Sequence, residues 1–338
     1  MVTLLACIFV FGILVSVHEF GHFITAKLTG MRVDEFAIGF GPKLFSHQGK
    51  ETLYSLRAIP LGGYNKIYGM EPGEECDDRG FNAKSVPRRM LVILAGSMMN
   101  FILPMVIFSG LFMFSGVDMP VKEPVFGEVL QEYPAAKAGM LAGDKVLQVN
   151  GKPVASWEEL RAGIMAADGK DIPILVDRGG EEKTFHMTAV TNPETGKPFI
   201  GVVAALHKVQ LGPVDSVKLA VRATVNMVQR MYAALYHIFT GNSSAELAGP
   251  VGVAKMTGQV AQQGIAMLLQ FTAMLSLNLA IINLLPLPAL DGGHFVLLLW
   301  EGITGRKLGK KVLLNIQTAG VIMILTITIL ATFHDLTR

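Results

Sequence analysis

One pentapeptide near the start of this 338-residue chain carries the side chains best suited to chemistry. It reads His18-Glu19-Phe20-Gly21-His22 and matches the pattern H-E-x-x-H. On a helix, the two histidines lie on the same face, so both imidazoles can reach one zinc ion. The glutamate between them can take a proton from a zinc-bound water, whose pKa the metal lowers toward about 7. The motif therefore predicts a hydrolytic zinc centre.

The motif lies in an apolar segment that begins at Leu4 and carries no formal charge before Glu19. Charged or metal-binding side chains are costly at membrane depth, so their presence there indicates function. We therefore expect hydrolysis within the bilayer or just below its surface.

Two histidines are too few, because a catalytic zinc site normally has three protein ligands and one open position. A second polar motif follows an apolar stretch at Asn283–His294, and Asp291 is its one acidic residue. Its prolines break a helix and its glycines permit close approach of the backbone, which lets the carboxylate turn inward. His294 is either a fourth ligand or a partner of Asp291, and the need for an open site favours the partner or a structural role. The histidines at 47, 186 and 237 are expected to be ordinary surface or packing residues.

The composition indicates a membrane protein, with 51% hydrophobic residues, 17% charged residues and a mean hydropathy of +0.45. Soluble domains carry nearer a quarter charged residues. Four apolar stretches reach the roughly 20 residues that a membrane-spanning helix needs. They are Leu4–Lys27, Met90–Val117, Ile265–Leu290 and Val312–Phe333. The first lacks a basic start and a small-residue cleavage site, so we interpret it as a membrane span and not a removable signal peptide.

The distribution of charge predicts the orientation in the membrane. Lysine and arginine are abundant in residues 28–89 and 302–311, and the N-terminal tail has none. The positive-inside rule then places both loops in the cytoplasm, and both termini and the long segment between spans two and three outside. Cys7 and Cys76 fall on different sides of this arrangement, so a disulfide is not expected. The net charge of +2 gives no indication of nucleic-acid binding.

Two segments outside the spans have strand signals. Glu51–Arg57 alternates polar and apolar residues, which predicts a small β-hairpin sheet near the membrane within residues 31–68. Residues 122–207 combine predicted strands with a helix at 157–166 and an Asn150-Gly151 hairpin turn. This segment resembles a PDZ domain, a fold that binds peptides by adding a strand to a sheet edge. A small α+β spacer is the alternative.

Residues 215–240 have apolar residues at helical spacing with basic residues between them. This pattern fits an amphipathic helix on the outer membrane surface and equally a helix packed against the spans. Asn100 and Gln270 lie within spans, where hydrogen bonds between helices are the expected role.

The whole chain resembles the site-2 protease family of intramembrane zinc metalloproteases. The resemblance rests on the 18–22 and 283–294 motifs, Gly39-Phe40-Gly41-Pro42, Pro60-Leu61-Gly62-Gly63-Tyr64 and Gly249-Pro250-Val251-Gly252-Val253. It implies His18, His22 and Asp291 as zinc ligands and Glu19 as general base and acid. It also implies that the sheet within Arg32–Tyr64, including Gly39, Gly41, Gly62 and Gly63, receives the substrate as an added strand, and that Asn283 holds the substrate backbone.

Two features depart from the family pattern. The family usually has Ala-Gly-Pro where this chain has Ala95-Gly96-Ser97. Many relatives carry two tandem PDZ domains, whereas this chain has the length for one.

These observations predict a polytopic α-helical membrane protein with four transmembrane helices, a membrane-associated β-hairpin sheet and one inserted extracytoplasmic PDZ domain. The expected division is 1–118 for spans one and two with the hairpin, 122–207 for the PDZ domain, 208–245 for a linking helix and 246–338 for spans three and four. The implied activity is zinc-dependent cleavage of single-pass proteins in the bacterial cytoplasmic membrane.

The resemblance implies substrates such as anti-sigma factors or remnant signal peptides, already cut outside by a site-1 protease, and a peptide C-terminus is a possible PDZ ligand. The competing hypotheses are a metal transporter or sensor, which leaves the glutamate of H-E-x-x-H unexplained, and a non-catalytic scaffold that holds clients through the PDZ domain.

Overall fold

The computed structural model describes residues 1–71, 73–167, 170–192, 196–240 and 249–337. They form two compact units, of which the first comprises Met1–Ser115 with Gly212–Arg338 and the second Gly116–Leu211.

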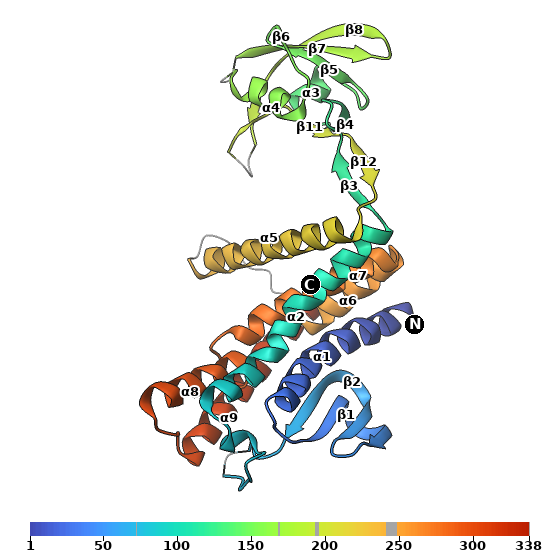
Figure 1. Ribbon diagram of the computed structural model, residues 1–338. Coiled ribbons are helices and arrows are strands. Elements are labelled where there is room, and N and C mark those ends of the chain that lie inside the picture. Colours follow the sequence, from blue (N-terminus) through green and yellow to red (C-terminus); the bar gives the residue numbers. More distant parts are fainter. Residues whose placement is uncertain (72, 168–169, 193–195, 241–248, 338) are drawn as a thin grey trace. The chain divides into compact units, whose positions relative to one another are not determined.

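The first unit is mainly helical (Figure 1). Its helices are α1 (Val2–Leu28), α2 (Val86–Phe114), α5 (Pro213–Phe239), α6 (Pro250–Gln262), α7 (Ile265–Leu284), α8 (Asp291–Thr304) and α9 (Lys310–Thr337), with a short 3₁₀ turn at Phe81–Ala83. The long strands β1 (Val33–Gln48) and β2 (Leu53–Ile67) follow α1 in the chain.

Within the described residues, four helices are long and apolar enough to cross a membrane, namely α1, α2, α7 and α9. The expectation of four apolar helices of spanning length is therefore confirmed. The third is shorter than expected, because α7 ends at Leu284 and the chain turns through Pro286 and Pro288. Proline lacks the N–H that a continuing helix requires. The chain then forms α8, a helix that the sequence analysis did not predict, with Asp291 at its first position.

Small residues and one ion pair hold the helices of this unit together. A side chain at Gly21 of α1 would collide with the carbonyl of Ala95 in α2, so the glycine permits close helix contact. Near its N-terminus, α2 is joined to α8 by the ion pair of Arg89 with Glu301. The guanidinium donates two hydrogen bonds to the carboxylate, of 2.9 Å and 2.6 Å, and Arg89 is buried. This geometry is the strong, bidentate form of an ion pair.

The strands β1 and β2 fold back on each other. Residues 35–38 of β1 are paired with residues 53–56 and also with residues 63–66 of β2, so this part of β1 lies between two segments of β2. The segment 63–67 has a strand partner on one side only among the described residues. It forms an edge of the sheet beside α1 (Figure 1).

The Gly249–Val253 element begins α6 and is held by the end of α9. The N–H groups of Gly249 and Gly252 donate to the two carboxylate oxygens of Asp335, at 3.0 Å and 2.7 Å. An acidic side chain at a helix N-terminus satisfies N–H groups that have no partner within the helix.

Helix α5 has two apolar faces. Ala220 and Met227 pack against Phe108 of α2, whereas Val214, Val221 and Tyr236 are among the exposed apolar side chains. The helix thus packs on a predicted span, as one of the two interpretations of its sequence expected, and its opposite face presents apolar surface.

The second unit is an α+β domain. Its elements are β3 (Val117–Pro120), β4 (Phe126–Val129), α3 (Pro134–Lys137), β5 (Lys145–Val149), β6 (Lys152–Pro153), α4 (Trp157–Met165), β7 (Asp171–Arg178), β8 (Glu181–Thr188), β9 (Val190–Thr191), β10 (Pro198–Phe199), β11 (Val202–Ala204) and β12 (Leu206–Val209). Its largest sheet has the order β6-β5-β7-β8. Asn150 and Gly151 both have positive φ, as a two-residue hairpin turn requires.

A buried carboxylate stabilises this domain. Asp144 accepts hydrogen bonds from Nε and Nη2 of Arg178, at 2.7 Å and 2.8 Å, and from the N–H of Leu141. Burial is the largest single influence and opposes ionisation. The hydrogen bonds from Arg178 and Leu141, together with the nearby positive charges, outweigh it and hold the pKa of Asp144 below its usual range. Because the folded pKa is the lower one, this stabilisation is complete above the unfolded pKa of about 3.9 and is lost as the pH falls through the folded value.

We predict that Asp144→Asn lowers the free energy of unfolding of this unit by roughly 1.5–3 kcal/mol at neutral pH, and that the difference from wild type shrinks at acid pH. Urea titrations followed by Trp157 fluorescence measure this, with Trp300→Phe in all variants to remove the other tryptophan. Glu132→Gln, an exposed carboxylate, is the control and should change little. A pH-independent difference between Asp144→Asn and wild type would contradict the prediction.

Candidate active site

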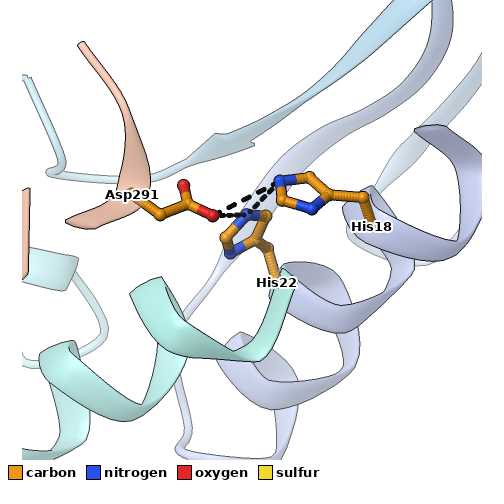
Figure 2. A group of neighbouring side chains, drawn as sticks. All are labelled: His18, His22 and Asp291. Atoms are coloured by element: carbon orange, nitrogen blue, oxygen red, sulfur yellow. Dashed lines mark hydrogen bonds and ion pairs between the residues drawn. The ribbon is translucent and has the colours of Figure 1, made fainter. Parts of the chain in front are cut away.

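Three polar side chains from two helices meet between the spans. His18 and His22 lie one turn apart on α1, and Asp291 is the first residue of α8. Figure 2 shows the carboxylate pointing toward the two imidazoles. Their ligand atoms all lie within 4.8 Å of one another.

The distances among these atoms fit a metal ion. Nε2 of His18 and Nε2 of His22 are 3.2 Å apart, and Oδ2 of Asp291 lies 3.4 Å from the first and 3.6 Å from the second. A tetrahedral zinc ion with bonds of about 2.0–2.1 Å separates its ligand atoms by about 3.3–3.4 Å. The three atoms therefore match one face of such a tetrahedron, and two imidazoles with one carboxylate are a donor set that zinc accepts.

Main-chain contact fixes the tautomer of His22. Its Nδ1 lies 2.8 Å from the carbonyl oxygen of Val92 in α2, so Nδ1–H donates to that oxygen. The lone pair then resides on Nε2, the atom that faces Asp291 and His18. A hydrogen bond at the far nitrogen is the usual way in which proteins orient a metal-binding histidine.

Asn100 of α2 orients the ring of His18 and sets its tautomer. Its amide nitrogen lies 3.3 Å from Nδ1 of the ring, and its Oδ1 is buried without a hydrogen-bond partner in the described part of the chain. A half-turn of the amide presents the oxygen to the ring, where it accepts a bond from Nδ1–H. This orientation satisfies the buried oxygen and frees Nε2 for a metal.

Two further residues of α2 complete the surroundings. Ser97 donates a 3.0 Å hydrogen bond to Oδ2 of Asp291, and its side chain is fully buried. Gly96 faces the ring of His22 so closely that a Cβ would overlap it. The Ala-Gly-Ser departure from the family pattern thus lies directly against the ligands.

Glu19 has its own support, from the sheet. The amide nitrogen of Asn65 in β2 donates to the backbone oxygen of Glu19 and to Oε2 of its carboxylate, each at 2.7 Å. Oε1 of Glu19 has no hydrogen-bond partner among the described residues. Gly63 lies next to the same side chain, since a Cβ there would come within 3.0 Å of Cγ of Glu19.

The other predicted site residues are not brought into contact with this centre. Gly39 packs against the main chain of Arg57 and Ile59, Gly62 against the ring of Phe40, and Gly41 near Ile59. Their positive φ values serve the bends of the sheet.

Asn283 lies in the last turn of α7, and its side chain makes no hydrogen bond with the described residues. His294 lies in the first turn of α8, and no hydrogen bond joins it to the ligand trio in the described structure.

A cavity of about 900 Å³ lies beside the site. Asn65 and His294 line it, and so do the charged loop residues Glu71, Glu74 and Lys307 and the first residue of α9, Lys310. The cavity therefore joins the neighbourhood of Glu19 and Asp291 to a charged rim.

Sequence reasoning missed Asn65 and Ser97, and it gave Asn100 only a general role. Asn100 carried a signal, because an amide inside an apolar span needs a partner. Ser97 was noted only because it replaces the proline of the family pattern. Asn65 lies next to a glycine-rich motif, and nothing in its sequence neighbourhood indicates a contact with α1.

The comparisons with known proteins cover nearly the whole chain. The model of the family described as "Peptidase family M50" matches residues 6–327. A protein of Clostridium acetobutylicum, provisionally named a zinc metalloprotease, is 36% identical over 330 residues, covering 97% of this chain and 95% of its own. The zinc metalloprotease RasP of Oceanobacillus iheyensis is 32% identical over 427 residues, covering 100% of this chain and 99% of its own.

Among solved structures, the PDZ domain of an SdrC-like protein from Listeria monocytogenes is 21% identical, with a TM-score of 0.23. It covers 26% of this chain and 93% of that chain.

We predict that Gly96→Ala weakens zinc binding by roughly 10- to 100-fold, because the new methyl displaces the His22 ring. Zinc content after equilibrium dialysis against a chelator of known affinity measures the loss. Gly110→Ala is the matched control: it lies in the same helix, and a Cβ there meets nothing within 4 Å. Equal zinc affinity in both variants would show that the ring does not need this space.

Proposed function

Since the chain belongs to peptidase family M50 and is a zinc metalloendopeptidase of a bacterial membrane, we propose that it cuts peptide bonds within the membrane-spanning segments of single-pass proteins. In this proposal His18, His22 and Asp291 hold the zinc ion, and Glu19 is the general base and acid. The observation that carries it is the triangle of ligand atoms, with separations of 3.2, 3.4 and 3.6 Å, at the end of an apolar helix.

The bound zinc ion supplies a Lewis acid that lowers the pKa of an attacking water. Glu19 accepts a proton from that water and returns it to the leaving amide nitrogen. Oε2 is occupied by the Asn65 amide, so the proton moves at Oε1. Asn100, Val92 and Ser97 keep the ligand atoms turned inward through the hydrogen bonds described above.

The substrate adds to the sheet as a strand at segment 63–67 of β2. A strand with one unpaired side offers N–H and C=O groups to a further chain. Among the described residues this segment has one strand partner, and Gly63 brings it against Glu19. Gly39, Gly41 and Gly62 shape the sheet that presents this edge, and Asn283 holds the substrate backbone through its amide, which no described residue engages.

Strand addition also explains how a membrane-spanning helix is opened. Its peptide bonds are hidden in helical hydrogen bonds, and exposed backbone groups are costly in an apolar medium. Pairing with the sheet edge replaces the bonds that are lost when the substrate helix unwinds.

The proposed orientation puts residues 28–89 and 302–311 in the cytoplasm and both termini outside, with residues 122–207 outside as the PDZ domain. Support comes from contacts between the two basic loops: Lys307 donates to the carbonyl oxygen of Asn82, and the side chain of Lys310 lies against Gly73. The 900 Å³ cavity between them and Asn65 is then the route of cytoplasmic water, and His294 lines it near Asp291.

The substrates proposed are single-pass proteins such as anti-sigma factors, cut first outside by a site-1 protease, and remnant signal peptides. Membership of a peptidase family argues against the alternatives of a metal transporter and a non-catalytic scaffold.

The PDZ unit is proposed to take a peptide C-terminus between α4 and β10–β11. A groove of about 390 Å³ there is lined by apolar side chains, among them Leu160, Ile164 and Val202. Arg161 and Lys197 also line it and suit a terminal carboxylate.

We predict that Glu19→Gln retains zinc and loses at least about 100-fold in cleavage rate, because the amide cannot accept the proton. The assay uses purified protein in vesicles with a single-pass substrate that carries a Gly-Pro pair in its span. Zinc content is measured on the same samples. Cleavage by Glu19→Gln at the wild-type rate would exclude the proposed role.

We predict that a peptide ending in apolar residues with a free carboxylate changes the fluorescence of Trp157, which lines the PDZ groove, in a Trp300→Phe background. The C-terminally amidated peptide should bind several-fold more weakly, and Ile164→Arg should block both. Equal binding of the two peptides would contradict a carboxylate site.

A further inference from the structure

We infer that Asn65 is a positioning residue for the reaction. It orients the carboxylate of Glu19 and fixes the position of this carboxylate relative to the strand edge that receives the substrate. The inference rests on the proposed function for its kinetic consequence. The contact itself is independent of any metal or substrate.

The amide of Asn65 makes a two-point contact with one residue. Its nitrogen donates to the backbone oxygen and to Oε2 of Glu19, both at 2.7 Å. Two hydrogen bonds from one rigid group fix the direction of the glutamate side chain as well as its distance. A bond to an ionised carboxylate is also roughly twice as strong as a neutral one.

The orientation of this amide is dictated by Glu19. Oδ1 of Asn65 is buried and has no partner among the described residues, which destabilises the folded state. A half-turn of the amide would place that oxygen against two other acceptors, the backbone oxygen and Oε2. The amide therefore leaves its own acceptor unsatisfied in order to donate twice to the base. This differs from Asn100, where the half-turn relieves the unpaired oxygen.

The position of Asn65 in β2 connects the base to the substrate edge. Alternate residues of a strand face the same side, so Gly63, Asn65 and Ile67 share one face. That face lies on α1: Gly63 touches Glu19, and Ile67 packs in the cluster that contains Ala26. A substrate strand paired with this edge is thereby held in a fixed register to Oε1 of Glu19.

Few other side chains fit this role. Aspartate would place a carboxylate against a carboxylate. An aliphatic residue would leave Oε2 of Glu19 without its donor. Glutamine has the same amide on a stem that is one methylene longer, so its nitrogen could not occupy the same position 2.7 Å from both acceptors without a shift of Glu19 or β2. In the sequence Gly-Gly-Tyr-Asn, the second glycine therefore leaves space for the side chain of Glu19, and the asparagine supplies its hydrogen-bond donor.

The kinetic test compares wild type, Asn65→Val and Thr52→Val with the Gly-Pro single-pass substrate in vesicles. Thr52→Val is the matched control, because Thr52 donates a buried 2.7 Å hydrogen bond to Val33 within the same sheet and does not contact Glu19. We expect Asn65→Val to lower kcat about 10- to 100-fold with KM and zinc content unchanged. Thr52→Val should lower stability with kcat unchanged. Equal kcat in both variants, or a change in KM alone, would overturn the inference.

A second measurement needs no activity. In metal-free protein, the shift in Tm caused by Asn65→Val is compared in the wild-type and Glu19→Ala backgrounds. Coupling predicts a smaller shift when Glu19 is absent, whereas the shift caused by Thr52→Val should be the same in both. An equal shift in Tm in the two backgrounds would show that Asn65 and Glu19 are not coupled and would overturn the inference. If coupling is present but the wild-type protein with zinc leaves the substrate intact, the proposed function has failed and the contact stands.

Discussion

The close approach of α1 to α2 is the constraint on which the rest of this unit depends. Gly21 admits the main chain of α2, and Gly96 admits the ring of His22. Only at this separation can a carbonyl, an amide and a hydroxyl of α2 reach the side chains of His18, His22 and Asp291. A polar cluster in apolar surroundings is tolerable only when its members are satisfied. The site is therefore a property of two helices in contact, with α8 supplying the third proposed ligand.

The sheet supports the other half of the centre. α2 orients the three predicted ligands, whereas β2 orients the base through Asn65. The ion pair of Arg89 with Glu301 holds α8 to α2 at the end of α8 that is remote from Asp291, so the ligand-bearing helix is fixed near both of its ends. Each chemical group is thus held by a different element, and the elements are held by contacts outside the site.

Residue type and spacing were enough to predict the four spans, and to single out His18, Glu19, His22 and Asp291 as the residues to examine. These signals are local in the sequence. They are the length of the apolar stretches, the one-turn spacing of the two histidines, and a single acidic residue among prolines and glycines. The helix α8 was missed because the prolines that precede it and the two glycines in its first turn indicated the end of a span. Ser97 and Asn65 could not be assigned a contact, because their partners lie 194 and 46 residues away in the chain. Such contacts depend on how helices and strands pack against one another, and the hydrophobic periodicity of the sequence does not specify that packing.

The groups that surround the ligands come from one short stretch of α2. Val92, Gly96 and Asn100 follow one another at intervals of four, and Ser97 adjoins them. A lineage can therefore retune how tightly the metal is held by exchanging residues within about three helical turns, while the ligands themselves stay the same. Two bacteria with identical ligand motifs would then differ in how well the enzyme keeps its metal when the cell is starved of zinc.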